Sequence, residues 1–137
     1  LGAEKLESMN LEREEVNEEI EKKEVRFEEV GIEDPDILLA LYGTVGRIAK
    51  STRKMAAEEG IELGLFRPIS VWPFPYERLG ELAEKVDTVM TVEMSDGQMH
   101  EDVRLAVGNK ARTPFYGRRG GVVPTPKEIL EEVKKYV

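Results

Sequence analysis

Two short segments of the chain carry residue types that can hold an anion at the start of a helix. Gly43-Thr44-Val45-Gly46-Arg47 and Ser95-Asp96-Gly97-Gln98 each join a predicted strand to a predicted helix. The first turn of a helix has backbone N–H groups without partners and the positive end of the helix dipole, and both favour phosphate or carboxylate. The candidate anion-binding residues are Gly43, Thr44, Gly46, Arg47, Ser95, Gly97 and Gln98.

Both segments also have a structural interpretation, which we favour. The first lacks the third glycine of a dinucleotide-binding loop and the lysine of a phosphate-binding loop, so a tight turn with Thr44 capping the helix explains it better. Ser95 and Gln98 have the spacing of a capping box. Four carboxylates near the second segment would oppose an anion, and a solvated helix face explains them better than a metal site: Glu93, Asp96, Glu101 and Asp102.

The inventory of nucleophiles and metal ligands is small. The chain has no cysteine and one histidine, which excludes disulfides, thiolate catalysis and a cysteine-ligated iron–sulfur cluster within it. We expect His100 at the surface, with no nucleophile beside it. Arg118-Arg119 could grip a carboxylate, and a solvated turn is an equally good interpretation. We therefore predict no catalytic residue and no metal ligand.

The segment Gly64–Pro75 holds three of the seven prolines and the only tryptophan. Leu65 and Phe66 indicate the end of a buried strand, and Pro68 ends it because proline has no N–H for the ladder. The run to Pro75 is then expected to be stiff and extended. An apolar aromatic loop of this kind usually packs against another surface, either in the same chain or in a partner.

Strands and helices alternate through the rest of the chain. Strands are predicted at 25–30, 37–42, 63–67, 88–93 and 113–116. Between the last four of them, apolar residues recur at helical spacing and predict helices. Thr125 and Glu128 form a capping box with Pro126 at the first helical position, so a final helix begins there. This order predicts an α/β fold with a mostly parallel sheet covered on both faces. Ligands of such sheets bind beyond the carboxyl ends of the strands, where 43–47, 67–75 and 95–98 are expected.

Charge is concentrated at the start of the chain. Residues 1–30 contain eleven Glu and five Lys or Arg, which is −6 of the total −8. We predict a solvated helix over 5–22 whose thin apolar edge contacts another surface. We also predict two units, an acidic connector helix (1–24) and an α/β domain (25–137). The negative charge argues against nucleic acid and anionic membranes as partners. No apolar run approaches the ~20 residues of a membrane span, no signal peptide is visible, and a cytoplasmic location is expected.

Several motifs occur in an order that resembles one enzyme family. They are Tyr42-Gly43-Thr44-Val45-Gly46-Arg47, Gly64-Leu65-Phe66-Arg67-Pro68-Ile69, Trp72-Pro73-Phe74-Pro75, Val92-Glu93-Met94 with Gly97-Gln98-Met99, Asp102-Val103-Arg104, Gly120-Gly121, and Pro124-Thr125-Pro126. Together they resemble the C-terminal part of the α subunit of 2-oxoacid:ferredoxin oxidoreductases, of the 2-oxoglutarate, 2-oxoisovalerate or pyruvate type. The likeness covers about residues 36–137, and it departs at Ser95, where the common family pattern has Asn.

The resemblance implies a three-layer α/β/α sandwich like the transketolase C-terminal domain, whose first strand, here near 25–30, runs antiparallel to the others. Enzymes of this family decarboxylate 2-oxoacids on thiamine diphosphate, make acyl-coenzyme A and reduce ferredoxin through iron–sulfur clusters. The resemblance also implies that thiamine diphosphate, Mg, the clusters and coenzyme A serve the whole complex, and that this chain binds none of them. Among 2-oxoacids we expect 2-oxoglutarate, closely followed by pyruvate and branched-chain acids.

The resemblance implies an assembly role for this chain. The sequence begins with Leu1 and not Met, so either the N-terminus was processed or poorly ordered, or this is a piece of a longer chain. From the resemblance we expect an excised or separately encoded C-terminal domain that is inactive alone. Its expected partners are the other domains and subunits, ferredoxin through the complex, or a second copy in a homodimer. Trp72 and Phe74 are expected to be exposed in the isolated chain or buried in such a dimer. The predicted interface is Arg67, Pro68, Trp72, Pro73, Phe74 and Pro75. The alternative function is a stand-alone binding or regulatory module for a small anion.

Overall fold

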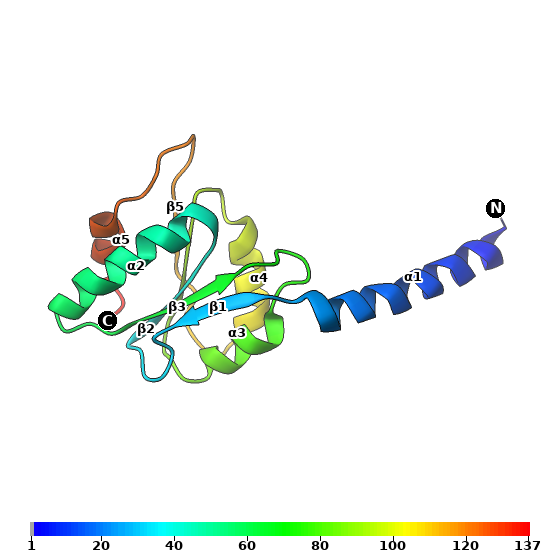
Figure 1. Ribbon diagram of the computed structural model, residues 1–137, viewed down its shortest axis with the longest axis horizontal. Coiled ribbons are helices and arrows are strands. Elements are labelled where there is room, and N and C mark those ends of the chain that lie inside the picture. The colour runs from blue at the N-terminus through cyan, green and yellow to red at the C-terminus, as the bar shows by residue number, and fades with distance from the viewer. Residues whose placement is uncertain (1) are drawn as a thin grey trace.

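In residues 2–137, which the computed structural model describes, five strands form one sheet (Figure 1). The strands are β1 (Phe27–Val30), β2 (Ile37–Leu41), β3 (Leu63–Pro68), β4 (Val89–Glu93) and β5 (Phe115–Gly117). Their order in the sheet is β1-β3-β2-β4-β5. β1 pairs antiparallel with β3, and every other pairing is parallel. The predicted mostly parallel sheet with an antiparallel first strand is therefore confirmed.

Helices cover both faces of this sheet and make the predicted three layers. The covering helices are α2 (Gly43–Glu58), α3 (Tyr76–Ala83), α4 (Gln98–Val107) and α5 (Pro126–Val133), and α1 (Ala3–Glu24) precedes them in the chain. The central strand β2 alternates its side chains between two cores, as a strand covered on both faces must. Ile37, Leu39 and Leu41 pack with α2 and α5. Leu38 and Ala40 pack with α3 and α4 on the opposite face.

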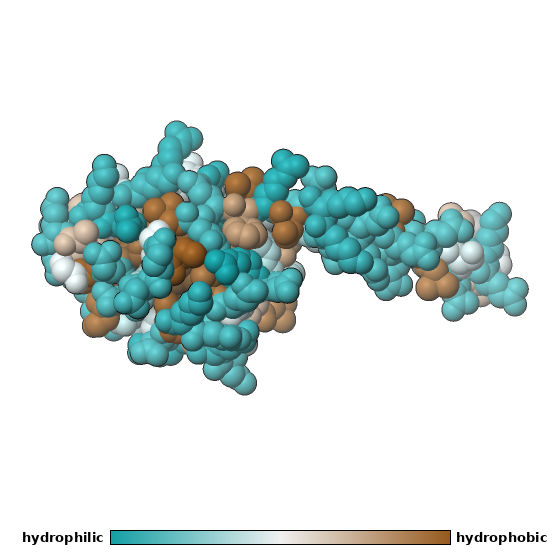
Figure 2. All heavy atoms as spheres, turned by 60° about the horizontal axis from the view of Figure 1, so that its bottom comes forward, coloured by the Kyte–Doolittle hydropathy of each residue, from teal (hydrophilic) through white to brown (hydrophobic). Residues whose placement is uncertain are grey.

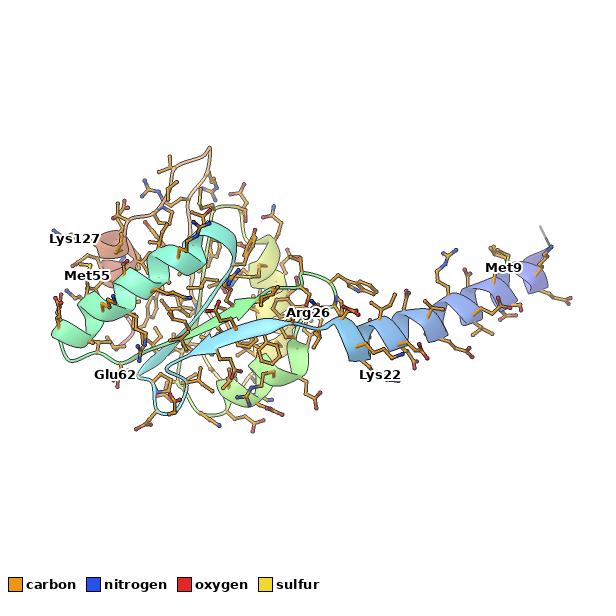
Figure 3. All side chains as sticks on the ribbon, viewed as in Figure 1. Met9, Lys22, Arg26, Met55, Glu62 and Lys127 are labelled. Atoms are coloured by element: carbon orange, nitrogen blue, oxygen red, sulfur yellow. The ribbon has the colours of Figure 1, made fainter. Side chains whose placement is uncertain are left out.

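Helix α1 projects away from the sheet and its covering helices (Figure 1). It has 22 residues, none of them buried, and Figure 3 places Met9 far from the rest of the chain. Leu6, Met9 and Val16 of the predicted apolar edge are exposed. The contact expected for that edge is therefore not made within the described residues. No described helix combines the length and apolar character that a membrane span requires.

The segment after β3 is bent, contrary to the extended run that its prolines suggested. β3 itself includes Pro68, which lies opposite Phe27 at the end of the antiparallel pairing. The chain then bends at Ile69 and again over 71–73, and the Trp72–Pro73 peptide bond is cis. The Ser70 hydroxyl donates to the Pro73 carbonyl oxygen at 2.8 Å, which closes the bend on itself.

Candidate docking surface at the carboxyl edge of the sheet

The carboxyl ends of β2, β3 and β4 lie at one edge of the sheet and bring the three predicted loops together. A cleft of about 180 Å³ lies among them. Its wall takes one residue from the end of β2, several from the end of β3 and the loop after it, and three from the first turns of α4: Tyr42, Pro68, Val71, Phe74, Gln98, Met99 and Asp102. This arrangement follows from the parallel strand order, because parallel strands open all their following loops at the same edge.

The loop after β3 divides its aromatic residues between the core and the surface. Phe74 is 5% exposed and packs in the core beneath α3 and α4, so the expectation that it is exposed is wrong. Its ring lies 4.9 Å from that of Tyr76. Trp72 is 57% exposed, as expected, and Ile69 and Val71 beside it are 53% and 67% exposed. The bend at 71–73 causes this division, because it turns Phe74 inward and leaves the preceding residues outside.

This loop is fixed to the segment that joins α1 to β1. The Arg26 carbonyl oxygen accepts the backbone N–H groups of Ile69 and Ser70 at 2.9 and 3.2 Å. The Arg26 N–H donates in return to the Ser70 hydroxyl oxygen at 2.9 Å. Figure 3 places Arg26 at the junction between the helix and the sheet. The exposed apolar side chains are therefore held in place beside the base of α1.

Arg67, a predicted interface residue, is engaged within the chain. Its guanidinium donates to Glu28 at 2.6 Å, and Lys50 donates to the same carboxylate at 2.8 Å. These two cations lower the pKa of Glu28, with Lys50 the larger cause. The Arg67 side chain crosses α2 at Gly46, where a Cβ would lie 2.8 Å from Arg67 Cδ. Gly46 therefore serves this close approach, and no anion is needed to explain it.

The start of α2 differs from the predicted capped turn. The helix begins at Gly43, whose φ is +59°, and the N-cap residue Tyr42 makes no side-chain hydrogen bond to it. Thr44 lies inside the helix and is exposed, so its predicted role as the cap is wrong. The first turn contains no acidic residue, and Arg47 is exposed one turn further on.

The predicted capping box at Ser95 and Gln98 is also wrong. α4 begins at Gln98 after Gly97, whose φ of +100° redirects the chain, and no N-cap side chain bonds to the helix. Glu93, at the end of β4 and 1% exposed, accepts the Met99 N–H at 3.1 Å instead. Its second oxygen and the Ser95 hydroxyl are buried without a hydrogen-bond partner among the described residues. Because the Glu93 side chain already bonds to this helix start, no external anion is needed to explain the 95–98 segment.

Two polar pairs near the cleft had no local signal in the sequence. The Tyr76 hydroxyl donates to Asp102, and this hydrogen bond is the main cause that raises the pKa of Tyr76 to about 12. His100 is half-buried and not on the open surface. Its Nδ1 lies 2.9 Å from the Thr91 hydroxyl oxygen. Burial is the main cause that lowers the pKa of His100. Each pair joins different elements, so only the folded chain reveals it.

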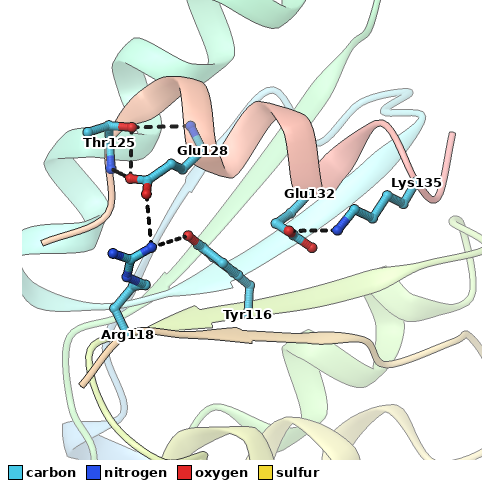
Figure 4. Close-up of polar contacts among 6 residues, drawn as sticks. All are labelled: Tyr116, Arg118, Thr125, Glu128, Glu132 and Lys135. Carbon is cyan, nitrogen blue, oxygen red and sulfur yellow. Dashed lines mark hydrogen bonds and ion pairs between the residues drawn. The ribbon is translucent and has the colours of Figure 1, made fainter. Parts of the chain in front are cut away.

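The two consecutive arginines bind carboxylates of this chain. Arg118 donates to Glu128 at 2.9 Å and to the Tyr116 hydroxyl oxygen at 3.3 Å (Figure 4). Glu128 completes the predicted capping box with Thr125, which is confirmed. Arg119 pairs with Asp96 and so ties the turn after β5 to the turn before α4. Both arginines therefore have structural partners.

The structure defines a class: a three-layer α/β domain with an exposed apolar loop over a cleft at the carboxyl edge of its sheet. No group of three or more histidine or acidic side chains in the described chain is arranged to hold a metal ion. The family model of the pyruvate:ferredoxin oxidoreductase core domain II matches residues 35–129. The chain belongs to this family, and the resemblance inferred from its motifs is confirmed.

Relatives with curated names are subunits of 2-oxoacid oxidoreductases. The ketoisovalerate oxidoreductase subunit VorB of Methanothermobacter marburgensis is 41% identical over 135 residues, which is 98% of this chain and 38% of that protein. The 2-oxoglutarate synthase subunit KorA of Archaeoglobus fulgidus is 35% identical over 110 residues, 80% of this chain and 30% of that protein. The chain thus spans less than two fifths of the length of these relatives.

Two solved structures share the fold. A 2-oxoglutarate:ferredoxin oxidoreductase from Magnetococcus marinus, with 2-oxoglutarate, coenzyme A and succinyl-CoA bound, superposes with a TM-score of 0.84 at 20% identity. The match covers 98% of this chain and 24% of that one. A split-gene transketolase, as an inactive β4 tetramer, gives a TM-score of 0.69 at 20% identity, over 81% of this chain and 41% of that one. The predicted transketolase-like fold is confirmed.

Proposed function

We propose that this chain is a region of a 2-oxoacid:ferredoxin oxidoreductase subunit that serves packing and subunit assembly. The main observation behind this proposal is the exposed apolar group of Ile69, Val71 and Trp72, which the backbone hydrogen bonds to Arg26 hold in place. The chain covers 38% of its relative VorB, so other parts of the subunit are available to contact this group. Exposed apolar groups of this kind mark contacts with other protein surfaces. The acidic segment 1–24, which contains α1, connects this region to the rest of the subunit, and residues 25–137 form the docked domain.

The complex we propose oxidatively decarboxylates a 2-oxoacid to acyl-coenzyme A and reduces ferredoxin. Thiamine diphosphate, Mg, iron–sulfur clusters and coenzyme A are held by its other domains and subunits. Identity over nearly the whole chain supports a branched-chain 2-oxoacid such as 2-oxoisovalerate over the 2-oxoglutarate that we first expected. Relatives with the subunit names VorB and KorA both contain the equivalent region. We therefore define the subunit by the presence of this region and not by the name α subunit.

Purification of the tagged chain from its native host, followed by identification of the co-purifying subunits, tests this function. We expect the remaining parts of one 2-oxoacid:ferredoxin oxidoreductase in defined stoichiometry. The isolated chain is expected to show no 2-oxoacid-dependent reduction of ferredoxin or of a dye. Turnover by the isolated chain, or its recovery as a lone protein under conditions that preserve the enzyme, would contradict the proposal.

A second candidate function is an anion-binding module that uses Gly43, Thr44, Gly46 and Arg47. The observation in its favour is that the first turn of α2 has neither a side-chain cap nor an acidic residue. A thermal shift experiment on the isolated chain with coenzyme A or inorganic phosphate tests it. An increase in Tm that the Arg47→Ala variant loses would support this module.

A further inference from the structure

The exposed loop after β3 and the base of α1 form one surface. The loop contributes Ile69, Val71 and Trp72, and Arg26 bonds the loop to the end of α1. Figure 2 shows apolar atoms gathered where the helix meets the body of the molecule. We call this surface the hinge face and define it by Ile69, Val71 and Trp72 together with residues 14–24 of α1.

A second cleft opens beside the hinge face and shares Glu21 with it. It has a volume of about 440 Å³ and lies between the end of α1 and the start of α3. Its apolar lining residues are Val25, Phe27, Phe74, Pro75 and Tyr76, and its charged ones are Glu21, Glu77, Arg78 and Glu81.

The charged residues of this second cleft are unequally engaged. Arg78 is bound by Glu29 at 2.6 Å and by Glu81 at 2.7 Å. Glu21 and Glu77 line the cleft, are exposed and make no ion pair within the described residues. A guanidinium or ammonium group on a long aliphatic stem fits such a cleft, because the stem contacts the apolar residues and the head contacts the carboxylates.

The negative charge of α1 also favours a partner with Lys and Arg on its surface. Residues 14–24 contain six Glu and two Lys, a net −4. The two lysines are already paired, Lys22 with Glu18 and Lys23 with Glu19. Two copies of this chain that met through the hinge face would bring −4 against −4, and like charges at an interface cost binding energy. A face with Lys and Arg at its rim is attracted instead.

We propose that the hinge face binds another subunit or domain of the oxidoreductase through an apolar patch rimmed by Lys and Arg, one of which enters the second cleft. This proposal rests on the proposed function for the identity of the partner. The surface chemistry itself is a property of this chain and can be measured without that partner.

The first experiment measures binding of the chain to the remaining subunits of the complex, purified separately, at several salt concentrations. The variant Glu21→Lys/Glu77→Lys is expected to lose about tenfold or more in affinity, a typical loss for central interface charges. Its affinity should also depend less on salt. The control Glu33→Lys/Glu58→Lys carries the same charge change at exposed sites of the β1–β2 connection and the end of α2, and should bind within about twofold of wild type. Circular dichroism spectra confirm that both variants fold.

The second experiment uses the isolated chain and a small probe. N-acetyl-arginine amide is expected to shift the NMR amide signals of Glu21 and Tyr76, whereas N-acetyl-citrulline amide, an uncharged isostere, should leave them unchanged. The Glu21→Gln/Glu77→Gln variant should lose the response to the arginine probe.

The two experiments separate the possible failures. If the wild type responds to the arginine probe and does not bind the remaining subunits, the proposed function fails and the cation-binding surface stands. If the subunits bind the charge-reversal variant as tightly as wild type, the basic partner is refuted and the proposed function stands. Identical responses to arginine and citrulline, or self-association that Trp72→Ala abolishes, overturn the inference.

Discussion

The buried carboxylate of Glu93 accepts the backbone N–H of Met99 at 3.1 Å and so joins the end of β4 to the start of α4. Through this bond the central part of the sheet sets the position of Gln98, Met99 and Asp102, which line the cleft at the carboxyl edge. A single side chain thereby links the core to the candidate docking surface.

Replacement of Glu93 by alanine should destabilise the domain by about 2–4 kcal/mol. The variant loses the buried hydrogen bond from the Met99 N–H and leaves a cavity. Glu93→Gln should cost less, because it keeps nearly the same volume and its amide oxygen can still accept the Met99 N–H. Denaturant unfolding of the three proteins measures this, and equal stabilities of the two variants would show that the bond contributes little.

Gly46→Ala should destabilise the domain by about 1 kcal/mol, since the new methyl group would crowd the Arg67 side chain. The same change in an Arg67→Ala background should be neutral or stabilising, because alanine favours the helix more than glycine does. A double-mutant cycle by chemical denaturation checks this. Equal effects of Gly46→Ala in both backgrounds would locate its cause outside the contact with Arg67.

Tyr76 should ionise well above the ordinary range of a tyrosine, with a pKa of about 12. The hydrogen bond to Asp102 favours the neutral phenol, so this contribution to stability is complete below the ordinary pKa of 10.0 and is lost as pH rises through about 12. A tyrosinate absorbance titration of wild type should show a step near pH 12 that is missing in Tyr76→Phe. In Asp102→Asn this step should move to lower pH, whereas an unchanged titration in that variant would assign the shift to another cause.

The capping box of α5 should weaken in acid. Hydrogen bonds from Thr125 are the main cause of the lowered pKa of Glu128, and Arg118 adds to it. A lowered folded pKa means that this stabilisation is present above the ordinary value of 4.5 and is lost as pH falls through the folded pKa. Thr125→Ala should cost about 1 kcal/mol at neutral pH. Thermal unfolding of wild type and variant from neutral pH to below pH 4.5 should show their difference narrowing in acid.

Alanine substitutions of Phe74 and Trp72 should differ in their effects on the stability of the domain and on its binding to the other subunits. Phe74→Ala removes a buried ring and should cost about 3–5 kcal/mol. Trp72→Ala removes an exposed side chain and should change stability by less than about 0.5 kcal/mol, yet it should weaken binding to the remaining subunits. Calorimetry and a binding assay on both variants measure the two effects. A large loss of stability in Trp72→Ala would place this ring in the fold and not at an interface.

Local patterns in the sequence were sufficient for most of the fold. The continuous apolar run Ile37–Leu41 has no polar face, so it had to be a strand covered on both sides, and it is. Thr125, Pro126 and Glu128 fixed the start of α5, because a capping box is completed within four residues. The ordered motifs between Tyr42 and Thr125 were enough to identify the family.

The candidate site could be predicted only in part, because its contacts join residues far apart in the chain. Ser95 and Thr44 have the residue types of helix caps, yet Glu93 caps α4 from the end of a strand and no side chain caps α2. Arg67 is held by Glu28, 39 residues away. Residue type and spacing thus determined the elements, their order and the apolar character of the loop after β3. Tertiary packing decided that Phe74 is buried and Trp72 exposed, since this depends on how the chain bends over helices that form later in the sequence.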